Sequence, residues 1–108
     1  MELRNYLHQL DIPLLYATED IPTEDKQIYV HFVFGNCHWF VAEFDQKDSC
    51  FGYVILNGDL QNAEWGYFSL HELQEVKLGN FRVSPEANWT PQSAKKVELI
   101  KLSSGIFF

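Results

Sequence analysis

Basic residues are scarce in this sequence. Eight Lys and Arg stand against fifteen Asp and Glu, which gives a formal net charge of −7, and the one adjacent pair of bases is Lys95 and Lys96. A general nucleic-acid binder needs clustered Lys and Arg to neutralise phosphates, so the composition argues against that class. We expect the negative charge to keep a small protein in solution. The sharper alternative is an acidic face that imitates DNA or docks on a basic partner.

Cysteines and long apolar runs are also few. Cys37 and Cys50 are the two cysteines, and two do not make a disulfide framework in a reducing compartment. No stretch approaches the ~20 apolar residues that cross a bilayer. The first residues lack the apolar segment of a secretory signal. The sequence therefore predicts a cytoplasmic protein without a membrane segment.

Apolar and aromatic residues, in contrast, are plentiful. They make up 46% and 16% of the 108 residues, with nine Phe, five Tyr and three Trp. Each large ring removes roughly 150–250 Å² from water when it is buried, so a chain of this length can build a core. We expect one domain over residues 1–108.

The first half of the chain predicts a helix, a loop and a hairpin. Leu3, Tyr6, Leu7 and Leu10 recur at helical spacing before Pro13, and the polar stretch 17–27 is typical of a mobile loop. Residues 28–44 are rich in β-branched and aromatic side chains around a Gly-Asn turn.

The register of this hairpin has two alternatives. A two-residue loop at Gly35 and Asn36 pairs Phe32 with Trp39, and a three-residue loop pairs Phe32 with Phe40. A slip of one residue exchanges the two faces of a strand. Because the other face carries His31, we expect the core face to be the one with Ile28, Val30, Phe32 and Phe34.

The second half predicts two more strands and a well-defined helix. Residues 50–56 and 65–68 have strand character. Ser69 and Glu72 then form a capping box, and Gly79 suits the end of a helix from Leu70 to about Lys77. A short strand is expected at 81–83. The segment after Pro91 fits a helix or a strand, with Ala94, Val97 and Ile100 facing the core.

These elements predict an α+β fold. We expect a mainly antiparallel twisted sheet of about four to five strands, with two or three short helices packed against it.

Several segments resemble the DUF2958 family of small bacterial proteins, whose function is not established. The resemblance implies a family fold and a setting near mobile-element genes, without implying a reaction. It is carried by Leu14-Leu15-Tyr16, Ile28-Tyr29-Val30, Phe32, Trp39-Phe40-Val41-Ala42-Glu43-Phe44-Asp45, Phe51-Gly52, Glu64-Trp65-Gly66-Tyr67-Phe68-Ser69-Leu70 and Glu72-Leu73.

Metal and thiol chemistry have few candidates. His31, Cys37, His38 and Cys50 are the soft ligands, but Cys37 and His38 are adjacent and point to opposite faces of a strand. A Cys37–histidine pair would lack a feature that lowers the thiol pKa. We therefore expect no metal, no cofactor and no thiol nucleophile, with a buried inert cysteine and surface histidines instead.

Carboxylates and aromatics remain as candidates. Glu43 and Asp45 alternate onto one strand face and would suit acid–base catalysis in a shared cleft. Trp39, Trp65 and Tyr67 would form a binding platform if they are exposed, although core packing explains each ring taken singly.

The leading hypothesis is a non-enzymatic module that binds a protein partner. It would use the candidates Trp39, Glu43, Asp45, Trp65 and Tyr67, with the acidic loop 19–25 as rim, and act as a monomer or weak homodimer. The rivals are a small carboxylate-dependent hydrolase-like enzyme and an acidic DNA-mimic inhibitor.

Overall fold

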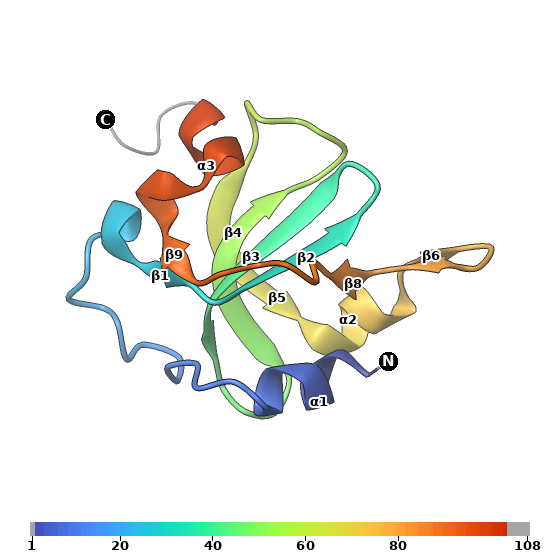
Figure 1. Cartoon of the computed structure of the whole chain (residues 1–108), viewed down its shortest axis with the longest axis horizontal. Helices are drawn as coiled ribbons and strands as arrows, with labels where there is room; N and C mark the ends of the chain where they lie inside the picture. Colours follow the sequence, from blue (N-terminus) through green and yellow to red (C-terminus); the bar gives the residue numbers. More distant parts are fainter. Residues whose placement is uncertain (1, 104–108) are drawn as a thin grey trace.

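A five-stranded antiparallel sheet forms the centre of the molecule (Figure 1). The computed structural model describes residues 2–103. The strand order is β5-β4-β3-β2-β8, so β2 to β5 follow one another as a meander. The strands are β2 Val30–Phe34, β3 Cys37–Phe44, β4 Ser49–Ile55, β5 Glu64–Ser69 and β8 Ser84–Pro85. The predicted α+β class and antiparallel sheet are confirmed.

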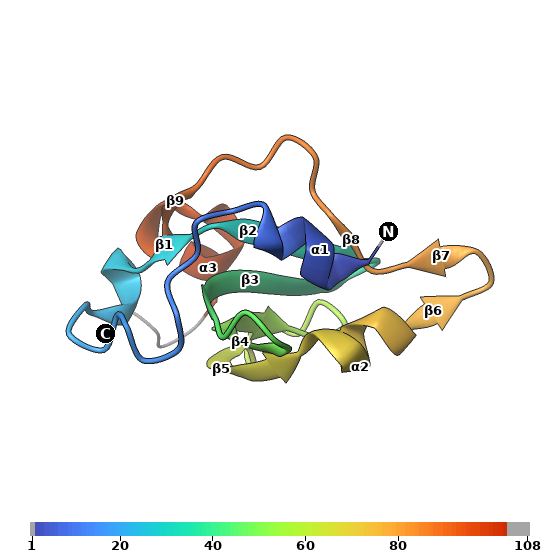
Figure 2. The same ribbon diagram turned by 90° about the horizontal axis from the view of Figure 1, so that it is seen from below.

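Short helices and two-residue strands complete the fold. β1 pairs with β9, and β6 pairs with β7 in a hairpin that projects from the body in both views (Figure 2). No described helix is long and apolar enough to span a membrane. The elements are α1 Leu3–His8, η1 Thr23–Asp25, β1 Gln27–Ile28, α2 Leu70–Glu75, β6 Lys77–Leu78, β7 Phe81–Arg82, β9 Gln92–Ser93, η2 Ala94–Lys96 and α3 Glu98–Leu102.

Both faces of the sheet are buried against other elements. On one face, Leu3 and Leu7 of α1 and Leu73 of α2 pack with Phe32 and Val41. The other face carries a second cluster, built by Phe40 and Tyr53 of the sheet together with Ala94, Val97 and Ile100 from the segment that contains η2 and α3. Ala94, Val97 and Ile100 thus face the core as predicted, on a segment that combines a short strand, a 3₁₀ turn and a helix.

The β2–β3 hairpin has the two-residue loop. Phe34 pairs with Cys37 and Phe32 with Trp39, while Gly35 has a φ of 57°, a conformation that glycine adopts readily at the first position of a hairpin turn. The expected core face is correct for Val30 and Phe32. Ile28 is an exception: it belongs to the second cluster, because β1 pairs with β9 and Ile28 is not part of β2.

Strand β3 contains a bulge. Val41 pairs with Gly52 and Glu43 with Phe51, so Ala42 is an extra residue. A Cβ at position 52 would lie 1.8 Å from the carbonyl oxygen of Phe40, and glycine is therefore required beside the bulge. The extra residue reverses the inside–outside alternation of the strand. Glu43 consequently lies on the α3 side of the sheet.

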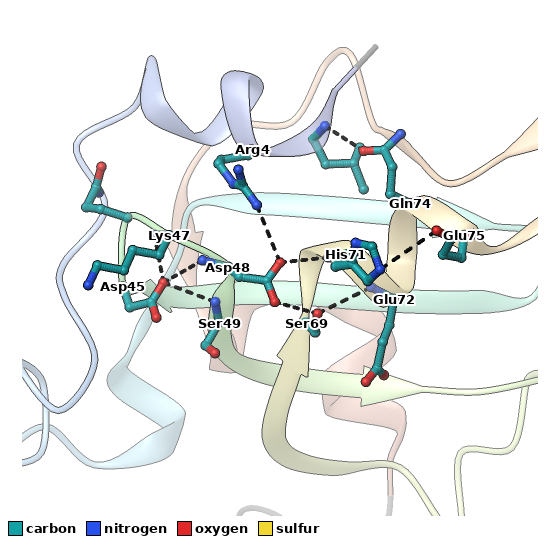
Figure 3. Close-up of polar contacts among 12 residues, drawn as sticks. Arg4, Asp45, Lys47, Asp48, Ser49, Ser69, His71, Glu72, Gln74 and Glu75 are labelled. Carbon is teal, nitrogen blue, oxygen red and sulfur yellow. Dashed lines mark hydrogen bonds and ion pairs between the residues drawn. The ribbon is translucent and has the colours of Figure 1, made fainter.

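The Ser69 half of the predicted capping box is present at the N-terminus of α2, and Asp48 reinforces this cap (Figure 3). The Ser69 hydroxyl accepts from the backbone N–H of Glu72 at 3.3 Å and donates to Asp48 Oδ2 at 2.6 Å. The backbone N–H of His71 donates to Asp48 Oδ1 at 2.8 Å. The aspartate thus joins the β3–β4 turn to the helix.

The predicted end of α2 is wrong. The helix ends at Glu75, and the chain continues into β6. Gly79, expected to terminate the helix, has a φ of 60° in the turn of the β6–β7 hairpin, where Leu78 pairs with Phe81. A glycine suited to positive φ serves a hairpin turn as well as a helix end, so the local signal alone did not distinguish them.

We predict that Ser69→Ala lowers the free energy of unfolding by about 1 kcal/mol, within a range of roughly 0.5–2 kcal/mol, because the substitution removes an N-cap acceptor. Urea denaturation measures the change. Ser84→Ala, at an exposed position of β8, is the control and should stay within about 0.5 kcal/mol of the parent. Equal midpoints for both variants would show that the cap contributes nothing.

Candidate functional site

Glu43 is a buried carboxylate that anchors a distant loop. Only 3% of its surface is exposed. Its Oε1 accepts from the backbone N–H of Tyr16 at 2.9 Å, and its Oε2 accepts from the backbone N–H of Thr18 at 3.1 Å and from the Thr18 hydroxyl. These bonds compensate for the cost of burying a charged group and attach the 16–18 segment to the sheet.

Lys26 joins the same network from the other end of the loop. Its ammonium donates to the carbonyl oxygen of Thr18 at 2.5 Å and to the Thr18 hydroxyl at 2.8 Å. The lysine is itself buried, and its Nζ lies 5.9 Å from the centre of the Phe51 ring. The Thr18 hydroxyl therefore stands between a buried cation and a buried carboxylate.

Tyr16 has a backbone conformation that is unusual for an aromatic residue. Its φ is 70°, a region that residues other than glycine adopt at a cost of roughly 1–3 kcal/mol and that occurs preferentially at functional sites. The bond to Glu43 holds it there. The residue is 61% exposed, so burial of the side chain does not offset the strain.

The exposed Tyr16 ring borders a pocket of about 390 Å³ on the α3 side of the sheet. The ring centres of Tyr16 and Tyr67 are 6.3 Å apart, and those of Tyr67 and Phe51 are 5.0 Å apart, with planes inclined at 55°. Two acids and one base give the lining a formal charge of −1. The lining residues are Tyr16, Glu19, Lys26, Glu43, Phe51 and Tyr67.

The electrostatics of this pocket affect Tyr67. Desolvation raises the pKa of its hydroxyl, with further contributions from the neighbouring Tyr16 hydroxyl and from the negative charges of Glu43 and Glu19. A negative potential opposes the loss of a proton and favours a nearby cation. The pocket is therefore better suited to a positively charged group than to an anion.

Two of the predicted site residues, Glu43 and Tyr67, lie together in this pocket. Trp65 stands behind it, stacked on Phe51 at 5.8 Å and edge-on to Tyr53 at 5.4 Å. Trp39 is only 6% exposed and belongs to the core on the opposite face of the sheet. A single platform of Trp39, Trp65 and Tyr67 is therefore ruled out, because the strand registers place Trp39 and Trp65 on opposite faces.

Asp45 does not share a cleft with Glu43. Its Oδ1 accepts from the backbone N–H groups of Lys47, Asp48 and Ser49 at 2.8 to 3.0 Å, closing the β3–β4 turn (Figure 3). Burial raises the pKa of Asp45, but these three donors and the Lys47 charge outweigh it and lower the pKa overall. The expected acid–base pair is not formed, because each carboxylate binds a different backbone segment.

Sequence reasoning missed Tyr16, Lys26 and Phe51 as pocket residues. Tyr16 and Lys26 flank the acidic loop, and Phe51 opposes Glu43 only because of the bulge. The sequence contained one indication of these neighbours: Glu43 lies in an apolar strand, and a buried carboxylate there requires hydrogen-bond donors from elsewhere in the chain.

A second polar cluster contains two histidines. Glu86 Oε1 lies 2.7 Å from His31 Nδ1, and His31 Nε2 lies 2.8 Å from His38 Nδ1. An ionised carboxylate only accepts, so His31 carries its proton on Nδ1 and His38 donates to His31. Burial lowers the pKa of both rings, and the neighbouring His31 lowers that of His38 further, although Glu86 opposes both shifts. The expectation of a surface position is wrong for His31, which is buried.

Neither cysteine joins these histidines. The half-buried Cys37 thiol lies by Asn57, at 3.4 Å from its backbone nitrogen. Cys50 is in the core, where burial raises the pKa of its thiol. Within residues 2–103, no group of three or more His, Cys, Asp and Glu side chains is arranged to hold a metal ion.

Comparison of the chain with protein-family models, curated proteins and solved structures found no match. The DUF2958 resemblance therefore stays an expectation from the sequence, and the site is interpreted from its own geometry.

We predict that Glu43→Gln destabilises the protein by about 1–3 kcal/mol, because the amide nitrogen cannot accept the donors of the 16–18 segment. Hydrogen exchange should accelerate most at the Tyr16 and Thr18 amides. Glu19→Gln, at an exposed residue of the same pocket, is the control and should leave these two rates unchanged. Unaltered exchange in Glu43→Gln would contradict the anchoring role.

We also predict that stability falls as the pH decreases below 6.5. The folded protein lowers the pKa of His31 and His38 from the value of 6.5, so the unfolded chain takes up protons first. The stabilisation is complete above 6.5 and is lost as the pH falls through the folded pKa values. Thermal melts across this range should show that the melting temperature of the double variant His31→Phe/His38→Phe depends less steeply on pH than that of the parent. His71→Gln, at an exposed histidine, should keep the parental slope.

Proposed function

We propose that this protein is a non-enzymatic binding module that holds a protein partner through the pocket between Tyr16 and Tyr67. The supporting observation is the exposed Tyr16 ring, held at a strained φ of 70° by a buried glutamate. Strain of this kind persists where the surrounding structure imposes it, and it is concentrated at sites of function. The Tyr16 ring contacts Tyr67 at 6.3 Å between centres but stays largely exposed, so we infer that the benefit of the strain lies in what the ring contacts outside the chain.

The partner that fits is one with a cationic side chain. Three aromatic rings and two carboxylates line the pocket against one base. The Lys26 ammonium over Phe51 already occupies the kind of position that a lysine or arginine from a partner would take over Tyr67. The net charge of −7 would also accelerate the approach of a basic partner.

The enzymatic alternative has less support. Both oxygens of Glu43 are committed to the 16–18 segment, whereas a general base must keep an oxygen directed at the substrate. Asp45, its expected companion, is held by its own turn. A rigid carboxylate that positions a loop is in keeping with a binding role.

Display selection tests the proposal. Short random peptides are selected on the immobilised protein, with Tyr67→Ala as counterselection. We expect the enriched peptides to contain Lys or Arg and to bind Tyr67→Ala at least about tenfold more weakly, since aromatic hot-spot residues dominate interfaces. Phe81→Ala removes a comparably exposed ring from the projecting hairpin and should bind as the parent does. Enrichment of acidic peptides, or peptides indifferent to Tyr67→Ala, would contradict the proposal.

A further inference from the structure

Strand β5 is an open edge of the sheet. The strand order ends at β5, and within residues 2–103 no strand pairs with its outer side. It is six residues long, and an edge of that length presents a row of unpaired backbone groups to any extended chain that approaches it.

The register determines which backbone groups are free. The N–H of Leu70 donates to the carbonyl oxygen of Asp48 at 2.9 Å, and the β4–β5 pairing continues from there without a shift. In an antiparallel pair the hydrogen-bonded positions alternate. Phe68, Gly66 and Glu64 therefore bond to β4, while the backbone groups of Trp65 and Tyr67 point outward.

A second pocket, on the opposite face of the sheet, also borders this edge. It encloses about 390 Å³ and includes Val54, Leu56, Asp59, Glu64 and Gly66. Val54 pairs with Glu64 on the face of the α1 and α2 core, whereas Phe51 and Tyr67 lie on the α3 face. Tyr67 borders both pockets. The two pockets are thus on either side of one edge strand, and both are acidic.

Gly66 has no internal reason to be glycine. A Cβ at this position would meet no atom within 4 Å, and its φ is outside the left-handed region, unlike that of Gly35. Glycine weakens a strand, and it frequently marks a place where another backbone or a ligand approaches closely. The absence of a side chain at position 66 leaves the second pocket open.

We propose that β5 accepts an extended, lysine- or arginine-containing segment of the partner as an added antiparallel or parallel strand. The inference rests on the proposed function and names its binding mode. Successive side chains of an extended strand point to opposite faces, so alternate residues of one segment reach the Tyr16–Tyr67 pocket and the Gly66 pocket. The backbone of the segment bonds to Trp65 and Tyr67, as in other cases of strand addition. Acids and apolar side chains line both pockets, so the cationic side chains of the segment enter one pocket and its apolar side chains enter the other.

The probe is an acetylated, amidated peptide about as long as β5 that alternates lysine and valine, and its control has the same composition in two blocks. We expect the alternating peptide to slow hydrogen exchange at Trp65 and Tyr67 by about tenfold or more, while Gly66, already bonded to β4, is unchanged. In an added strand, every second peptide amide points toward β5 and the others point away. N-methylation of the amides that point toward β5 should abolish binding, and N-methylation of the others should leave binding intact. The block peptide should bind more weakly.

A variant tests the second pocket independently of the first. Gly66→Val places a β-branched side chain in the open space of the second pocket. The variant should keep the parental melting temperature, and its affinity for the alternating peptide should fall more than its affinity for the block peptide. A variant that binds the alternating peptide as the parent does would overturn the use of both faces.

The two proposals fail in different ways. If the alternating and block peptides bind equally and depend on Tyr67, with exchange at Trp65 and Tyr67 unchanged, the binding module stands and strand addition is wrong. If neither peptide binds and Tyr67→Ala has no effect on selected peptides, the proposed function itself is wrong. Concentration-dependent protection of Trp65 and Tyr67 without peptide would assign the edge to a second copy of the chain.

Discussion

The bulge at Ala42 is the constraint on which the candidate site depends. Without the extra residue, strict alternation would direct Glu43 into the apolar core with Trp39 and Val41, and Phe44 away from it. With it, Phe44 packs into that core and Glu43 faces Phe51, at the place where the 16–18 segment passes. One inserted residue thus allows Phe44 to be in the apolar core and its neighbour Glu43 to be outside it. Gly52 accommodates the displaced backbone.

Local signals in the sequence predicted local structure well. The Ser69 cap, the Gly35 turn and the apolar positions of the C-terminal segment depend on neighbours within a few residues, and the structure has all three. The predicted end of α2 was wrong because it also rested on a local signal: Gly79, with its positive φ, suits a hairpin turn as readily as a helix end. Local sequence defines which backbone conformations and hydrogen bonds a residue favours, but it does not determine which helix or turn contains the residue.

The candidate site depends on contacts between distant segments, and the sequence predicted it only in part. Glu43 and Tyr67 were identified, and the acidic loop 19–25 was expected as a rim, but Tyr16 and Lys26, which flank that loop, were not assigned to the site. Trp39 was misassigned because alternation along a strand does not reveal that both faces of the sheet are covered. The separation of Glu43 from Asp45 followed from hydrogen bonds to two backbone segments, which no spacing rule describes.

Backbone hydrogen bonds fix the position of both tyrosines at the site. Tyr16 and Tyr67 are both largely exposed, yet Tyr16 is fixed through its backbone and Tyr67 through the pairing of β5 with β4. Backbone held in this way loses little further conformational freedom when a partner covers the site, which reduces the entropic cost of association.

The link between Thr18 and Lys26 closes a loop at its neck. The two residues are eight apart in the sequence and their contact ties both ends of the segment to Glu43. The residues between them form the acidic tip of the closed loop. Lengthening a closed loop costs only about 0.6 kcal/mol for each doubling of its length, so insertions after Glu19, which itself lines the pocket, would leave the tyrosine pocket assembled. The segment can therefore diverge in evolution at its tip, where a partner would meet it, while the neck preserves the fold.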